Sequence, residues 1–135
     1  MSEDNGVRDS ATTAAELRLD AERLDVYGVA LAFHGPAGAL ALGRGLSPLR
    51  DQLDRASTSI VLNIAEGAGR RGAADRARFF AIARGSATEC AAILDILRAR
   101  QLATPAITSR GRSLLVRIVQ MLTRLCQRLD AEAGS

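Results

Sequence analysis

Apolar residues recur every three or four positions from about residue 15 to residue 131, and polar residues fill the positions between them. This spacing places apolar side chains along one side of an α-helix. Glycine- or proline-containing turns separate four such segments, so we predict helices over about 15–42, 47–68, 74–100 and 105–131. Because short turns join antiparallel neighbours, the sequence predicts an all-α, up-down-up-down four-helix bundle that forms a single domain.

Proline marks three places along this pattern. Ser47-Pro48 and Thr104-Pro105 each place a hydroxyl residue before a proline, which is typical of a helix N-cap followed by the first helical position. Gly35-Pro36 falls inside the first helix instead, and Pro36 has no amide hydrogen to donate to a helical hydrogen bond. We therefore expect the first helix to be kinked or broken there. Residues 1–14 are polar and predict a disordered tail.

The third and fourth helices carry the clearest core rows. On the third helix the predicted row is Phe79, Ala83, Ser86, Cys90, Ile93 and Leu97. On the fourth helix it is Leu115, Ile118, Leu122, Leu125 and Leu129. The fourth helix is also apolar beyond this row, which indicates further burial against other subunits. Cys90 lies on the first row and Cys126 beside the second, and both are expected to be buried free thiols.

Polar and small residues interrupt the apolar pattern of the two middle helices, at positions expected to be core. They are Arg55, Ser59, Asn63, Glu66 and Gly67 on the second helix and Gly85, Ser86 and Glu89 on the third. Such a stripe is either a functional site or a device that pairs helices. We favour the structural alternative, in which the polar side chains form hydrogen-bonded pairs between the two helices. Gly67 and Gly85 would then permit close approach of the two backbones.

Charge is distributed unevenly along the 135 residues. All eighteen basic residues are arginine; residues 1–49 have a net charge of −3, whereas residues 50–135 carry fourteen arginines against eight acids. This asymmetry is compatible with a polyanionic partner. The candidate nucleic-acid-binding residues are Arg70, Arg71, Arg76 and Arg78 near the second turn, with Arg117, Arg124 and Arg128 on the fourth helix. A solvated outer face of a bundle is the alternative, and a 3% aromatic content disfavours recognition by base stacking.

Several catalytic and ligand-binding classes are excluded by their residue requirements. Residues 67–72 read G-x-G-x-x-G, but a helix precedes them where dinucleotide binding requires a strand. His34 is the single histidine and no Glu-x-x-His pair exists, so no metal or other cofactor is expected. Candidate nucleophiles lack a base, and we expect no enzymatic activity. With no membrane span or signal peptide in the pattern, a cytoplasmic protein is expected.

Three linked motifs carry a family resemblance. Residues 52–60, 63–67 and 79–86 with Glu89 closely resemble the bacterial four-helix bundle proteins first noticed as reading frames in intervening sequences of large-subunit ribosomal RNA genes. The resemblance implies an up-down-up-down bundle that assembles as a ring-shaped homopentamer and has no attached enzymatic activity. A more distant similarity is to the accessory variability determinant of diversity-generating retroelements, a basic pentamer that engages a reverse transcriptase and nucleic acid.

Two functional hypotheses follow. In the first, the protein is a non-enzymatic homo-oligomer that binds a partner through arginine-rich surfaces. The candidate partners are RNA, DNA and a reverse-transcriptase-like protein. In the second, the protein is an interaction scaffold that recognises another protein and does not bind nucleic acid. Neither involves a membrane.

Overall fold

The computed structural model describes residues 20–38 and 47–134, so the predicted disordered tail lies outside the described residues. A short 3-10 helix, η1 (Asp20–Arg23), precedes four α-helices. These are α2 (Asp25–Gly38), α3 (Ser47–Gly69), α4 (Ala73–Ala99) and α5 (Pro105–Ala133). The described residues contain no strand, and the predicted all-α four-helix fold is confirmed.

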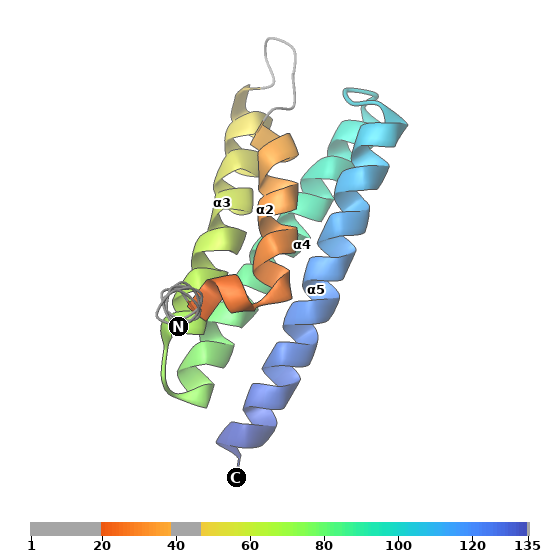
Figure 1. The fold of residues 1–135 in the computed structure, drawn as a ribbon. Coiled ribbons are helices and arrows are strands. Elements are labelled where there is room, and N and C mark those ends of the chain that lie inside the picture. Colours follow the sequence, from red (N-terminus) through yellow and green to blue (C-terminus); the bar gives the residue numbers. More distant parts are fainter. Residues whose placement is uncertain (1–19, 39–46, 135) are drawn as a thin grey trace, which may run out of the picture.

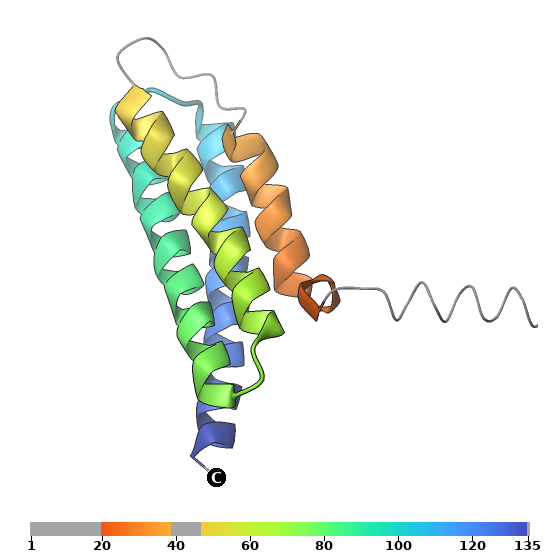
Figure 2. The ribbon, with the colours of Figure 1, turned by 90° about the vertical axis from the view of Figure 1, so that its left-hand side faces the viewer.

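The helices alternate in direction along the chain (Figure 1): α2 and α4 run one way, and α3 and α5 run the other. Within the described residues the helices form a closed cycle, in which each helix packs closely against two neighbours and the two diagonal pairs have no Cα atoms within 8 Å of each other. α2 has 14 residues against the 29 of α5, so it covers only part of the length of α5. η1 lies at the start of α2 and turns away from the bundle axis (Figure 2).

Local sequence explains where the helices begin and end. Thr104 caps α5, because its side-chain oxygen accepts a hydrogen bond from the backbone nitrogen of Ile107 at 3.4 Å, and Pro105 occupies the first helical position. α2 continues through Pro36 to Gly38, so the expected alternative of a break at Gly35-Pro36 is wrong. Pro36 cannot donate to the carbonyl of Ala32, but it lies in the last turn of α2, so only Ala37 and Gly38 of this helix follow the lost hydrogen bond. The interruption falls earlier, at Leu24 between η1 and α2.

The buried rows differ from the predicted rows by one residue at several positions. On α4, Phe80 and Ala87 have no exposed surface, whereas Phe79 and Ser86, which were expected in the core, are only partly buried. On α5 the row continues through Cys126 instead of Leu125. The buried α4 row also alternates three and four residues, through Phe80, Ala83, Ala87, Cys90, Leu94 and Leu97. The expected row therefore had the right period but took the neighbouring residue at alternate positions.

Both cysteines are free and buried, as predicted. Burial, with a smaller contribution from the neighbouring carboxylate of Glu89, raises the pKa of the Cys90 thiol to about 12. Burial also raises the pKa of Cys126. Since the thiolate is the nucleophilic form, neither cysteine is poised for nucleophilic chemistry near neutral pH.

Gly67 marks the closest approach of α3 to α4. A Cβ atom built on it would lie 2.8 Å from Cε1 of Phe80 and 3.2 Å from the carbonyl oxygen of Arg76. The ring of Phe80 is fully buried, so it has no open space into which it can move.

We therefore expect Gly67→Ala to lower the free energy of unfolding by about 1–3 kcal/mol through overpacking, measured by urea denaturation. Gly69→Ala is the matched control, because nothing lies within 4 Å of a Cβ at that exposed position. It should leave stability unchanged or raise it by up to about 1 kcal/mol. Equal effects of the two substitutions would contradict a steric role for Gly67.

Candidate functional site

Part of the predicted polar cluster forms between α3 and α4. The hydroxyl oxygens of Ser59 and Ser86 lie 2.8 Å apart and join the two helices by a hydrogen bond. The side-chain amide of Asn63 donates to the backbone oxygen of Ser59 at 2.9 Å and to its hydroxyl oxygen at 3.0 Å. Among the described residues, every buried side-chain nitrogen and oxygen atom has a hydrogen-bond partner. These three residues therefore form a satisfied polar contact that fixes the register of α3 against α4.

The other members of the predicted cluster lie at the surface. Arg55, Gly85 and Glu89 are exposed, and neither charged side chain forms a hydrogen bond or ion pair within the described part of the chain. Glu66 is also exposed and pairs at 3.4 Å with Arg70, the first residue after α3. No atom lies within 4 Å of a Cβ built on Gly85, so the expected close approach is found at Gly67 and not at Gly85.

These exposed residues nevertheless share one side of the bundle. Arg55, Ser59, Leu62 and Glu66 are spaced four, three and four residues apart on α3, and Ser59 meets Ser86 on α4. A hollow of about 380 Å³ opens there, and its lining includes Arg55, Ser59, Ser86 and Glu89. Two exposed apolar side chains lie on the same stripes, with Leu62 59% and Ile82 44% exposed. We call this the α3–α4 face, made of Arg55, Ser59, Leu62, Glu66, Ile82, Gly85, Ser86 and Glu89.

The arginines at the turn between α3 and α4 are largely engaged in local contacts. Arg70 lies 3.7 Å from a carboxylate oxygen of Asp75, in addition to its contact with Glu66. Arg78 lies 3.0 Å from the other carboxylate oxygen of Asp75. The two guanidinium carbons lie 4.8 and 4.6 Å from the ring centroid of Phe79, which explains why this phenylalanine remains at the surface. The acids thus offset the charge of these two arginines.

Arg76 and Arg71 complete this predicted cluster. Arg76 donates from Nε to the carbonyl oxygen of Gly67 at 3.4 Å, where the last carbonyls of α3 lack helical partners. Arg71 is exposed and forms no ion pair within the described residues. Of the four arginines predicted here, Arg71 alone is thus exposed without a described partner.

α5 presents a different arrangement of charge. Residues 105–129 contain five arginines and no acid. Arg117, Arg124 and Arg128 are exposed and form no ion pair among the described residues, and the same holds for Arg110. Positions 110, 117, 124 and 128 fall within about 40° around a helix and span about 27 Å along it. We call Arg110, Arg117, Arg124 and Arg128 the α5 arginine row.

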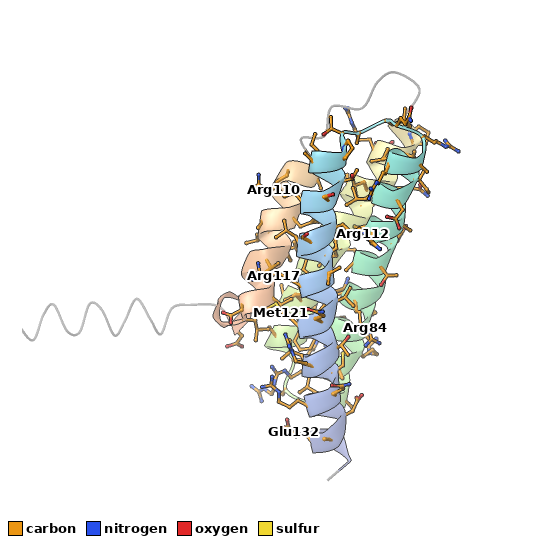
Figure 3. The ribbon with its side chains drawn as sticks, turned by 90° about the vertical axis from the view of Figure 1, so that its right-hand side faces the viewer. Arg84, Arg110, Arg112, Arg117, Met121 and Glu132 are labelled. Carbon is orange, nitrogen blue, oxygen red and sulfur yellow. The ribbon has the colours of Figure 1, made fainter. Side chains whose placement is uncertain are left out.

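The row lies on one side of α5. Figure 3 shows Arg110 and Arg117 on the side of α5 that faces α2, whereas Arg84 and Arg112 lie on the side of α4. Arg112 is 3.8 Å from a carboxylate oxygen of Asp95, and Arg84 donates to the hydroxyl oxygen of Thr123 at 3.4 Å. Sequence reasoning missed Arg110, although its seven-residue spacing from Arg117 could have identified it.

The described residues offer little for catalysis. They contain no group of three or more His, Cys, Asp or Glu side chains placed to hold a metal ion. Nε2 of His34 lies 3.0 Å from the hydroxyl oxygen of Thr58, so the imidazole joins α2 to α3. None of the helices in the described ranges has both the length and the apolarity to cross a membrane. The most distinctive surface chemistry is therefore the unpaired positive charge of α5.

Comparison with known proteins identifies one family. The sequence model of the family described as "23S rRNA-intervening sequence protein" matches residues 45–124, which include all of α3 and α4 and most of α5. A search of curated proteins finds no match.

The hydrogen bond between the two serines can be tested by a double-mutant cycle. We expect Ser59→Ala and Ser86→Ala to be coupled by about 0.5–1.5 kcal/mol in the free energy of unfolding, because either change alone removes the same contact. Ser113→Ala on α5 provides an exposed control that should show no coupling to Ser59→Ala. Strictly additive effects of Ser59→Ala and Ser86→Ala would argue against a stabilising bond.

Proposed function

Because the chain belongs to the 23S rRNA-intervening sequence protein family, we propose that it is a non-enzymatic, homo-oligomeric helical bundle that binds structured nucleic acid. The α5 arginine row is the proposed contact surface. Phosphate groups are the proposed ligands, and the absence of interleaved aromatic side chains favours contact with the backbone over stacking on bases.

The observation that carries this proposal is the difference between the two arginine clusters. Arg70 and Arg78 already contact carboxylates and an aromatic ring, so a phosphate would have to compete with these partners. The α5 arginine row has no such competitor within the described residues. Four guanidinium groups spread over about 27 Å can contact several phosphates of one nucleic-acid helix. Release of condensed counterions would then supply much of the binding free energy.

Self-association is the second part of the proposal, and the α3–α4 face supports it. Leu62 and Ile82 expose apolar surface there, and Gly85 presents bare helix backbone with open space in front of it. Arg55 and Glu89 carry opposite charges on the same face and have no partner in the described residues. A second copy could cover the apolar side chains and pair both charges. The family resemblance favours five copies in a ring.

Oligomerisation would strengthen nucleic-acid binding through multivalency. A single row of four arginines gives a weak and strongly salt-dependent interaction. Several rows held in fixed positions by one assembly raise the effective concentration of each row once another is bound.

For the assembly, we expect the wild-type protein to have the mass of five chains in analytical ultracentrifugation, and Gly85→Leu to reduce that mass. A leucine there would fill the space required by the neighbouring copy. Gly28→Leu is the matched control, since Gly28 is also an exposed helical glycine with nothing within 4 Å of a Cβ. A monomeric wild type, or an unchanged mass for Gly85→Leu, would contradict the proposed interface.

For nucleic-acid binding, we expect an RNA hairpin and a DNA duplex to bind with an affinity that falls steeply with salt. Arg117→Gln/Arg124→Gln should lower the affinity and reduce the magnitude of the log–log salt slope by about 1.4–1.8 for each chain engaged, because each phosphate contact contributes about 0.7–0.9. Fluorescence anisotropy at several salt concentrations measures both quantities.

Arg70→Gln/Arg78→Gln removes the same charge from the α3–α4 turn and serves as the control. Its effect on the slope should be the smaller of the two, because those arginines are already paired. The absence of binding at low salt would overturn the nucleic-acid proposal and favour the alternative of a protein-interaction scaffold.

A further inference from the structure

A pocket of about 200 Å³ opens between α2, α4 and α5, near the C-terminal end of α2 and the N-terminal part of α5. Phe33 and Leu94 form its walls, and both belong to the buried core, with 3% and 2% of their surface exposed. Pro36 and Ile107 lie at its exposed rim. The pocket therefore has a fixed apolar interior and an opening to solvent.

Gly111 keeps this space open. A Cβ atom on Gly111 would lie 2.9 Å from Cδ1 of Leu94 and 3.4 Å from Cε1 of Phe33. Glycine is the least favourable residue in a helix interior after proline, and Gly111 lies in the second turn of the 29-residue helix α5. Any larger residue at this position would extend into the space between α5 and these two side chains. The sequence thus has glycine, which disfavours a helix, at the position where a side chain would narrow the pocket.

Arg110 gives the pocket its polarity. Among the described residues of the lining it is the single charged one and none is acidic, and it forms no ion pair within the described part of the chain. Figure 3 shows it on the side of α5 that faces α2. The described lining therefore combines a largely apolar surface with one guanidinium group that can donate two parallel hydrogen bonds to a carboxylate.

We propose that this pocket binds a small monocarboxylate with an apolar ring or chain. An apolar cavity of about 150 Å³ is known to bind benzene, so about 200 Å³ is suited to a ring or chain of about six to eight carbon atoms. The apolar part lies between Phe33 and Leu94, and the carboxylate meets Arg110. Arg110 also belongs to the α5 arginine row, so the two proposed ligands would share this guanidinium group. The carboxylate site requires only Arg110 and the apolar cavity, whereas nucleic-acid binding is tested at Arg117 and Arg124.

The test uses two probes, hexanoate and phenylacetate, and their uncharged amides, hexanamide and phenylacetamide. At constant ionic strength, both acids should cause saturable shifts in the NMR signals of Phe33, Leu94 and Ile107 in the full-length protein. The amides should bind about tenfold more weakly, since they lose the charge-assisted contact. Arg110→Gln should weaken binding of the acids by about tenfold and leave binding of the amides unchanged.

Arg112→Gln is the matched control, because Arg112 is exposed on the same helix but lies near Asp95 on α4. It should leave binding of the acids unchanged. A second variant, Ile107→Trp, adds bulk at the exposed rim and should weaken both acids and amides.

Three results would overturn the proposal. One is the absence of saturable shifts in the wild type. Another is an equal loss of acid binding in Arg110→Gln and Arg112→Gln, which would indicate general attraction of anions to α5. The last is acid binding that Ile107→Trp leaves unchanged, which would place the ligand outside the pocket. None of these results bears on nucleic-acid binding, which is measured separately with Arg117→Gln/Arg124→Gln.

Discussion

The close packing of α4 between α3 and α5 is the constraint on which the rest of the structure depends. Ala83 and Ala87 have no exposed surface, and their small side chains let the neighbouring helices approach closely. Larger side chains from the neighbours then fill the interior, including Ile60 and Ile64 of α3 and Ile118 and Leu122 of α5, all fully buried. Because two sides of α4 are used in this way, its charged residues are confined to the remaining surface, where Arg78, Glu89 and Arg98 are exposed.

The sequence predicted the bounds of α3, α4 and α5 closely, because their ends depend on local chemistry, whereas the helix expected from residue 15 begins as α2 only at Asp25. Thr104-Pro105 starts α5 as expected, since a hydroxyl cap and a proline act within one turn. The choice between Phe79 and Phe80 could not be made in this way. Both lie next to each other in the same apolar run, and the outcome depends on contacts with residues of another helix. Gly67 provides space for the ring of Phe80, and Arg70 and Arg78 contact the ring of Phe79.

The arginine clusters also differ in whether their contacts could be predicted from nearby residues in the sequence or depend on how the chain folds. The turn between α3 and α4 brings Asp75 back toward Arg70, a contact that no spacing within one helix predicts. The basic character of α5 was readable in principle, because residues 105–129 contain arginines and no acid. Similarly, sequence spacing placed Ser59 and Asn63 on one stripe. Only the packing of α3 on α4 shows that Ser86 completes the contact while Glu89 remains in solvent.

The closed cycle of helix contacts also separates the two proposed binding surfaces. α3 and α5 are diagonal to each other in this cycle, so the α3–α4 face and the α2 side of α5 lie on opposite sides of the bundle. Copies joined through the α3–α4 face would therefore leave the α5 arginine rows directed away from that contact.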